Sequence, residues 1–143
     1  MQDKNDFEIK FGYDKMNFEK ITEMLAGAYW SKHIKMEEVK QGAKNSALVA
    51  GVFHQDDQVG YARVISDKTR FAYILDVFVD KRFRKKGIGQ WMVDNILNHE
   101  DLKDVYQWLL MTKDAHEVYK KSGFTSLKFP DWYMEIRHDR PDR

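Results

Sequence analysis

The chain has 143 residues, 43% of them hydrophobic, and its 24 basic and 23 acidic side chains leave a formal net charge of +1. This length predicts one domain covering residues 1–143, and the balanced charge argues against a dedicated nucleic-acid-binding protein, which would carry a basic excess. The chain has no cysteine, which excludes a disulfide scaffold, thiolate zinc sites and a cysteine nucleophile.

The first third of the chain predicts a strand and two helices after a polar N-terminus. Met1–Asp6 lacks the apolar stretch of a signal peptide, and no run approaches the roughly 18 apolar residues of a membrane span, so we expect a cytoplasmic protein with no membrane partner. Phe7–Tyr13 alternates weakly and suits a first strand. Apolar residues keep helical spacing over Phe18–Ala28 after Asn17, a natural N-cap, and Met36–Ala43 suits a second, shorter helix.

The middle of the chain predicts a hairpin followed by a buried strand. Ser46–Phe53 and Val59–Ile65 are strand-like runs joined by a polar turn, as in an antiparallel hairpin. Phe71–Val79 is an apolar run with a single charge at Asp76, which suits a central strand covered on both faces.

The C-terminal half predicts a parallel crossover and further strands. After a glycine-containing loop, an apolar stripe marks a helix that ends near Asn98, and Val105–Met111 is again a buried type of strand. Ala115–Lys121 suits a short helix, and the last strands are expected at Phe124–Phe129 and Trp132–Ile136. Because the strand–helix–strand order is long enough for one parallel crossover, we expect a mixed sheet with helices packed on it.

The loop between the buried strand and the crossover helix, Arg84-Lys85-Lys86-Gly87-Ile88-Gly89, has the character of an anion site. A helix N-terminus presents unpaired N–H groups and partial positive charge, and the two glycines let the backbone approach an anion closely. Five of the six residues over Lys81–Lys86 are basic and would attract a polyanion. Solvated surface charge and a nucleic-acid patch stay open as alternatives, although only Phe83 interleaves an aromatic ring here.

The same loop resembles the central signature of the GNAT superfamily of N-acetyltransferases: Arg or Gln, two residues, Gly, any residue, then Gly or Ala. Downstream, Thr112–Phe124 is similar to the family's small helix with an alanine, a tyrosine and then Gly-Phe. Together the two matches cover Phe71–Phe124. The resemblance implies an α/β (α+β) fold, with a mixed, mostly antiparallel sheet of six to seven strands, a central splayed parallel pair and about four flanking helices.

The resemblance also implies acetyl-CoA as co-substrate, with its pyrophosphate at the loop and its pantetheine arm between the splayed strands. Splayed strands expose backbone groups that need partners, which gives this placement a physical basis. No metal is expected, because the histidines show no metal-ligand spacing. The residues expected to bind acetyl-CoA are Phe78, Val79, Arg84, Lys85, Lys86, Gly87, Ile88, Gly89, Gln90, Thr112, Ala115 and Tyr119.

For catalysis, the resemblance implies direct attack of an amine on the thioester, and the chain has no cysteine to form an intermediate. Tyr119 is the candidate general acid, because a phenol donates a proton while neutral; the alternative is a ring packed on the sheet. Asp76, which strand alternation places on the face of Ile74 and Phe78, is the candidate base. The alternative for Asp76 is an ion pair with Arg63, and many family members use no dedicated base.

Aromatic residues are candidates for the wall of the acceptor site, namely Tyr29, Trp30, His33 and Trp132, although they could equally cap the core. The acceptor is expected to be a small-molecule or peptide amine, and no nucleic-acid partner is expected. A catalytically silent CoA-binding or interaction domain of the same fold is the alternative to an enzyme. Since edge strands in such folds often pair, a homodimer is a further expectation.

Overall fold

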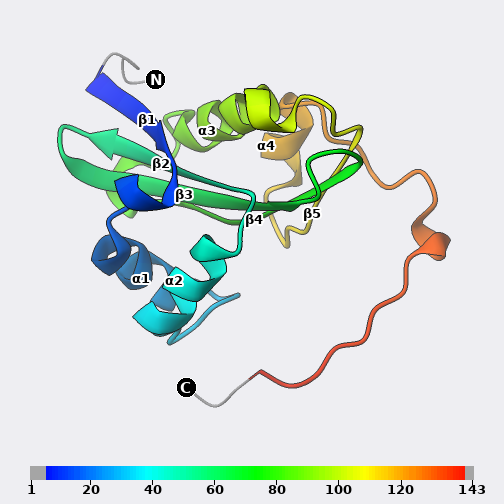
Figure 1. Cartoon of the computed structure of the whole chain (residues 1–143), viewed down its shortest axis with the longest axis horizontal. Coiled ribbons are helices and arrows are strands. Elements are labelled where there is room, and N and C mark those ends of the chain that lie inside the picture. The colour runs from blue at the N-terminus through cyan, green and yellow to red at the C-terminus, as the bar shows by residue number, and fades with distance from the viewer. Residues whose placement is uncertain (1–5, 141–143) are drawn as a thin grey trace.

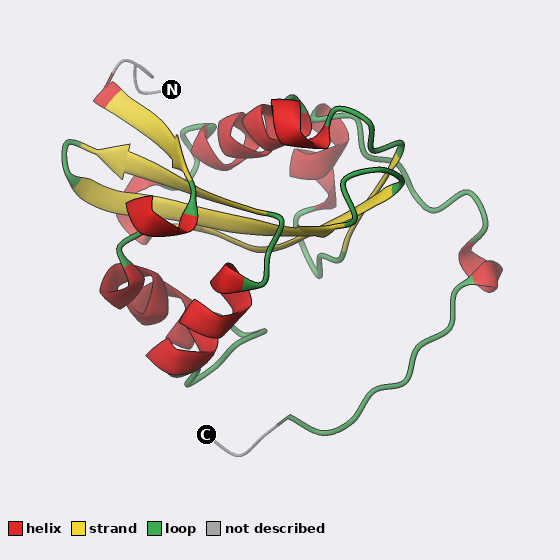
Figure 2. Ribbon diagram, in the orientation of Figure 1, coloured by secondary structure: helices red, strands yellow, loops and turns green. Residues whose placement is uncertain are grey.

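A computed structural model describes residues 6–140, so all but the last residue of the polar stretch Met1–Asp6 lies outside the described part. A five-stranded sheet with the order β1-β2-β3-β4-β5 lies at the centre. Helices α1 and α2 cover one face of the sheet, and α3 and α4 lie over the other (Figure 1). The alternation of helices and strands confirms the expected mixed class (Figure 2).

The first four strands are antiparallel neighbours, and the fifth runs parallel to the fourth. The predicted hairpin and the predicted parallel pair are therefore confirmed. The strands are β1 (Phe7–Phe11), β2 (Leu48–His54), β3 (Asp57–Ser66), β4 (Phe71–Val79) and β5 (Gln107–Leu110).

The helices begin where the sequence predicts them. The Asn17 side chain accepts a hydrogen bond from the Lys20 N–H at 3.1 Å, which confirms the predicted cap. Within residues 6–140, no helix has the length and apolar character needed to cross a bilayer. The helices are α1 (Phe18–Ala26), α2 (Met36–Lys44), α3 (Ile88–Leu97) and α4 (His116–Lys121).

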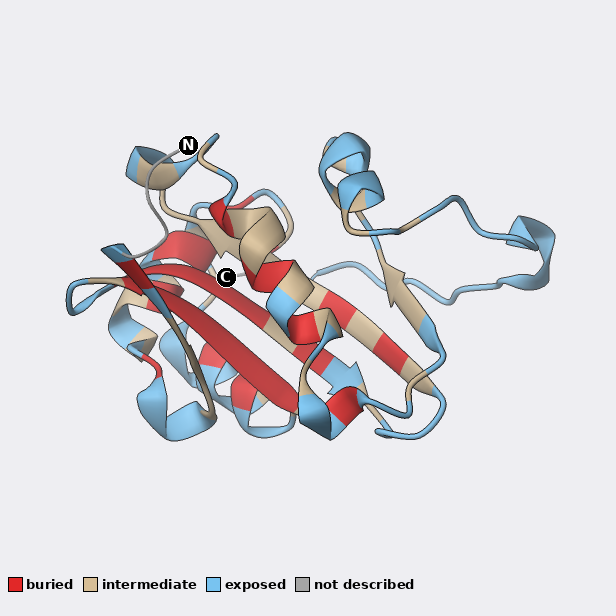
Figure 3. Cartoon of the chain, turned by 90° about the horizontal axis from the view of Figure 1, so that it is seen from above, coloured by how far each residue is buried: buried red, intermediate tan, exposed pale blue. Residues whose placement is uncertain are grey.

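Each face of the sheet has its own apolar core. On one face, the buried side of α3, including Met92 and Ile96, packs on the central strands. On the other, Ile21 and Leu25 of α1 pack with Val39 of α2 against β2 and β3. Figure 3 shows the buried residues running along the central strands. Cover on both faces explains why β2 and β4 are nearly continuous apolar runs.

A bulge interrupts β4 at Asp76. This residue has a φ of 57°, in the left-handed region, and the pairing of β3 with β4 shifts register between Tyr61 and Arg63. The extra residue breaks strict alternation, so Ile74 packs in the core under α3 whereas Phe78 packs on the α1 side. The prediction that Ile74 shares a face with Asp76 and Phe78 is therefore wrong for Ile74.

The strands predicted at Phe124–Phe129 and Trp132–Ile136 do not form, so the sheet has five strands and not six or seven. Residues 125–140 instead arch away from the body, with one 3-10 turn at Pro130–Trp132 (Figure 1). Alternating apolar and polar residues predict a strand that is buried on one side, but they do not specify which edge it pairs with. In the described chain the segment forms no backbone ladder with a strand of its own molecule.

Candidate functional site

The parallel strands β4 and β5 part halfway along β4. Their register ends with Ile74 opposite Leu110, the last residue of β5, whereas β4 continues to Val79. From Leu75 onward, no strand of the described residues lies beside the edge of β4 that faced β5. A groove with a volume of about 1370 Å³ opens there. The splayed pair implied by the sequence is thus present, and it leaves backbone groups able to bond to a ligand.

The loop after β4 leads to an open helix N-terminus. Gly87 is the N-cap of α3, with a left-handed φ of 78° and no side-chain cap. The first backbone hydrogen bond of the helix runs from the Trp91 N–H to the Gly87 carbonyl at 3.0 Å. In the described part of the chain, the N–H groups of residues 87–90 have no protein acceptor. The buried Ile88 side chain leaves only its backbone on this surface, so the first turn can bind an anion through its amides.

The arginine of the signature faces the strand. Arg84 Nε donates a hydrogen bond to the Val79 carbonyl at 2.9 Å, and its guanidinium lies 4.9 Å from the centre of the Phe78 ring. Arg82 forms ion pairs with Asp57 and Asp80. Lys85 is exposed and has a φ of 64°, in the left-handed region. Arg84 therefore fastens the loop to the end of β4, which positions the helix N-terminus.

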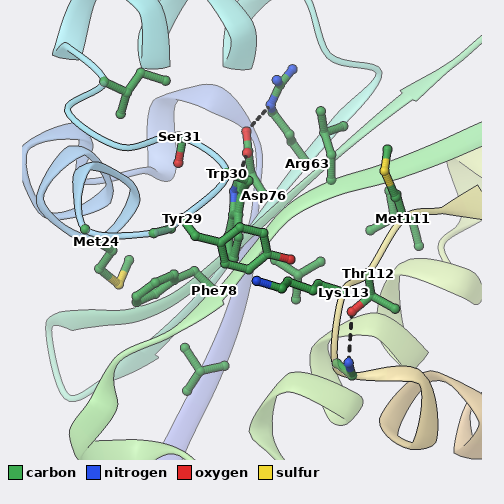
Figure 4. Close-up of a pocket in the computed structure, with 18 of the residues that line it drawn as sticks. Met24, Tyr29, Trp30, Ser31, Arg63, Asp76, Phe78, Met111, Thr112 and Lys113 are labelled. Atoms are coloured by element: carbon green, nitrogen blue, oxygen red, sulfur yellow. Dashed lines mark hydrogen bonds and ion pairs between the residues drawn. The ribbon is translucent and has the colours of Figure 1, made fainter. Parts of the chain in front are cut away.

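Helix α4 brings Tyr119 to the groove on the side opposite β4. Its ring is half-buried and lies edge-on to Phe124, with 6.0 Å between ring centres. Burial raises the pKa of the Tyr119 phenol, which keeps it protonated at neutral pH. Thr112 and Ala115 also line the groove, and Thr112 Oγ1 accepts a hydrogen bond from the Ala115 N–H at 3.0 Å (Figure 4). That bond stabilises the start of α4.

Asp76 projects from the bulge into the groove with both carboxylate oxygens engaged. Arg63 Nε donates to Oδ2 at 2.6 Å, and Trp30 Nε1 donates to Oδ1 at 3.1 Å (Figure 4). The ion pair with Arg63, weighed as the alternative to a catalytic base, is therefore present. The carboxylate also fixes the indole of Trp30 beside the groove. A base role for Asp76 stays a prediction.

Two of the four predicted acceptor-wall aromatics lie at the groove. Tyr29 and Trp30 line it with their rings edge to face at 5.0 Å, and Lys113 Nζ lies 5.3 Å from the centre of the Tyr29 ring (Figure 4). His33 and Trp132 are not among the groove-lining residues of the described chain: His33 is exposed in a turn, and Trp132 is 73% exposed on the tail.

Two arginines that no motif marks also line the groove. Arg137 and Arg140 come from the tail, and Arg140 donates a hydrogen bond to the Tyr29 carbonyl at 2.8 Å. Isolated arginines in a polar segment carry no spacing signal in the sequence. Only the arch of the tail brings them near the groove.

Comparison with known proteins is consistent with this geometry. A family model described as an acetyltransferase (GNAT) domain matches residues 45–126. A solved structure of a GNAT-family protein from Xanthomonas campestris pv. campestris superposes with a TM-score of 0.86 and 32% identity, covering 92% of this chain and 93% of that one.

Two relatives are similar in sequence. The N-acetyltransferase ycf52 of Pyropia yezoensis is 26% identical over 129 residues, which are 82% of this chain and 72% of that protein. N-alpha-acetyltransferase 60 of Xenopus tropicalis is 31% identical over 91 residues, which are 59% of this chain and only 38% of that longer protein.

Proposed function

We propose that this chain, which belongs to the GNAT acetyltransferase family, moves an acetyl group from acetyl-CoA to a primary amine by direct attack. Membership of the family is shown by the match over residues 45–126. The acyl donor, the amine and the direct route are the proposal. The observation that carries it is the uncapped first turn of α3, where the N–H groups of residues 87–90 stand beside the splayed strands.

The first turn of α3 fits a diphosphate. Within residues 6–140 its N–H groups have no protein acceptor, and the macrodipole gives this end of the helix about half a positive charge. The left-handed Gly87 carries no Cβ on the approach to the turn. Lys85 adds positive charge from the exposed side of the loop. These features favour the pyrophosphate of a CoA ester over a monoanion.

The open edge of β4 fits an extended amide-containing arm. In the part of the chain that the structure describes, no strand lies on the β5 side of residues 75–78, so their backbone can form the hydrogen bonds that a neighbouring strand would form. The pantetheine arm carries amides that suit this edge. Acetyl-CoA bound in this way supplies an activated thioester in the groove. The thioester would lie between Asp76 on β4 and Tyr119 on α4, which line the same groove.

Tyr119 would donate the proton that the departing thiolate needs. Its raised pKa keeps the hydroxyl in the donor form, and its position on the groove wall suits direct contact with the sulfur. Direct attack also requires a neutral amine. An alkylamine has a pKa of about 10.4, so only about one molecule in 10³ is neutral at pH 7, a penalty of roughly 4–5 kcal/mol.

The acceptor end of the groove would hold the amine against aromatic rings. Trp30, fixed by Asp76, and Tyr29 offer faces that attract a cation and cover its carbon chain. Asp76 would draw the ammonium form toward this wall, and a proton could pass to it or to water. Because Arg63 already pairs with the carboxylate, we expect Asp76 to position Trp30 and the amine more than to take the proton.

The test combines binding with turnover. Titration calorimetry should show that acetyl-CoA binds, and that an acetylated pantetheine thioester without the diphosphate binds at least about 30-fold more weakly, the loss of roughly 2 kcal/mol expected for charge-assisted hydrogen bonds. Release of free thiol should then depend on one class within a panel of primary amines.

Each other outcome points elsewhere. Binding of acetyl-CoA without thiol release on any amine would favour a silent CoA-binding domain. Equal affinity for the two thioesters would overturn the assignment of the α3 N-terminus. A salt-sensitive shift with DNA or RNA, in the absence of any CoA effect, would favour the nucleic-acid alternative.

A further inference from the structure

Residues 125–140 form a tail that carries large apolar side chains into solvent. Every residue in this range is exposed, and Met134 and Ile136 expose 98% and 87% of their surface (Figure 3). The rings of Phe129 and Trp132 stack on each other with 3.9 Å between their centres. Ordering such a segment costs conformational entropy with little burial to offset it. An exposed cluster of this size and character marks an interaction surface.

The tail is held to its own molecule by few contacts. In the part of the chain that the structure describes, Gln107 Nε2 donates to the Tyr133 hydroxyl at 2.7 Å and Arg140 donates to the Tyr29 carbonyl. Among residues 6–140, the backbone hydrogen bonds of the tail serve only the turn at Pro130–Trp132, and none reaches a strand. The side chains of Trp132, Met134 and Ile136 therefore stay largely uncovered by the described part of their own chain.

The segment 132–136 has the pattern of a strand that is buried on one side. Its apolar residues Trp132, Met134 and Ile136 are spaced by two and so share one face in an extended chain, with Glu135 on the other. Tyr133, which follows the turn at Pro130–Trp132, has an extended backbone with φ -97° and ψ 138°. What the segment lacks is an edge to pair with.

Such an edge is present on β5. This strand is the last in the sheet order, so in the described chain no strand lies on its outer side. Tyr106 and Met111 flank it and are 72% and 68% exposed. An open edge with apolar side chains at both ends is a template for adding a strand.

We propose that residues 132–136 of one copy pair with the outer edge of β5 in a second copy, and that the exchange is reciprocal. Each copy carries both the strand and the edge, so a twofold arrangement uses both and leaves neither open. Residues 125–136 can span about 40 Å at about 3.3–3.6 Å per residue, which is enough to reach a neighbouring copy.

The arm offers exposed apolar surface for such a contact. Trp132, Met134 and Ile136 expose 73%, 98% and 87% of their surface, and a reciprocal exchange covers them twice. Stable interfaces bury roughly 1,200–2,000 Å² in total, to which both arms and both β5 edges would contribute. The added strand would also fix β5, which forms one side of the groove through Leu110.

The first test is the association state. Sedimentation velocity should show the full chain as a dimer, and the double variant Met134→Asp/Ile136→Asp should raise the dimer dissociation constant at least about 100-fold, because two buried charges per arm lose hydration. In a single chain these positions are exposed, so circular dichroism and the melting of the monomer should not change. Met36→Asp, an exposed apolar position in the first turn of α2, is the matched control and should stay dimeric.

The second test asks where the arm binds. The chain has no cysteine, so copies with Gln107→Cys can be mixed with copies that carry Met134→Cys and a size tag. A short bismaleimide should link the two kinds of copy, because the proposed pairing brings residue 134 of one copy close to residue 107 of the other. Each chain carries a single cysteine, so any link must join two chains. Any of three results would overturn the proposal, whether or not acetyl-CoA binds. These are a monomeric full chain, a double variant that dimerises as well as the parent, and a dimer that does not form this link.

Discussion

Gly87 sets the backbone shape of the proposed anion site. Its φ of 78° turns the chain into α3 and leaves the first amides uncovered, whereas Gly89, two residues later, is helical. A Cβ on Gly89 would lie 3.6 Å from Val79 Cγ2, an ordinary contact. The two glycines of the motif therefore differ in how well they tolerate a larger residue. Only at Gly87 does the backbone conformation require glycine.

This difference predicts the outcome of two alanine variants. Gly87→Ala should destabilise the protein by about 1–2 kcal/mol, because alanine resists the left-handed region, while Gly89→Ala should be neutral or slightly stabilising in the helix. Urea unfolding measures both. Equal effects would show that Gly87 is free to change conformation.

A carboxylate at the same place tests the ligand. Gly87→Glu should weaken the binding of acetyl-CoA at least about 100-fold, since it opposes the diphosphate at a distance of a few ångströms. Gly87→Ala serves as its control, because it shares the backbone strain without the charge. Calorimetric affinities that match for the two variants would contradict the loop assignment.

If Tyr119 is the general acid, the pH dependence of the rate should reflect the pKa of its phenol. Tyr119→Phe should lower kcat about 10²- to 10⁴-fold, the usual contribution of general acid catalysis, with little change in the affinity for acetyl-CoA. Because the folded-state pKa of this phenol is raised, the parent enzyme should keep its acid form, and its rate, to above pH 10. A parent profile that falls between pH 8 and pH 9 would show that another group is the acid.

At the scale of elements, α1 depends on one side-chain cap. Asn17 accepts the Lys20 N–H, and its own backbone N–H donates to Gln58 Oε1 at 2.8 Å, which ties the start of the helix to β3. Asn17→Ala should cost about 1 kcal/mol of unfolding free energy, and Asn17→Ser should restore most of it, since serine also caps. Chemical denaturation of the three proteins gives the comparison.

The elements that the sequence predicts well are those whose signal is local. The apolar run Phe71–Val79 and the capped helix after Asn17 fall where periodicity and capping place them. The bulge at Asp76 could not be predicted in this way. An apolar run does not reveal an extra residue that turns the following side chains to the opposite face of the sheet. The strand predicted at Trp132–Ile136 failed for a different reason. The sequence shows the amphipathic pattern of a strand, but whether the segment pairs depends on a sheet edge that is distant in the sequence.

The site follows the same division. The open N-terminus of α3 after the loop Arg84–Gly89 could be anticipated from its motif, because an anion site at a helix N-terminus needs particular residues at fixed spacing. A second motif drew attention to Tyr119, which the structure places at the groove. The functional roles of both stay predictions. The pairing of Asp76 with Arg63 could be raised only as an alternative, and the arginines of the tail could not be found at all. Contacts between distant segments depend on how the elements pack.

Across the whole molecule, one ionic cluster links α1, the start of β3 and the end of β4. Lys20 lies 3.1 Å from Asp80 and 3.2 Å from Asp57, and Arg82 bonds to both aspartates. The hydrogen bond from Arg82, with support from Lys20, holds the pKa of Asp80 well below its usual range. The folded state therefore favours the charged carboxylate more than the unfolded state does.

The sign of the pH effect follows. A depressed pKa contributes stability that is fully present above the unfolded value of about 3.9, and this contribution is lost progressively as the pH falls from there through the folded-state pKa. The melting temperature should thus drop as the pH falls below about 4, and Asp80→Asn should be less stable than the parent at pH 6, with a gap that narrows steadily from about pH 4 to about pH 2. A constant gap across this range would show that Asp80 acts through its shape alone.

The short fifth strand has a consequence for the fraction of the protein that is folded in a cell. By ending at Leu110, β5 leaves part of β4 without its ladder, and a bound acyl donor would complete that ladder as a surrogate strand. Ligand at 100 times its dissociation constant adds about 2.7 kcal/mol to folding, comparable to a sizeable fraction of a domain's stability. The population of folded protein, and its resistance to proteolysis, would then rise and fall with the concentration of CoA and its thioesters.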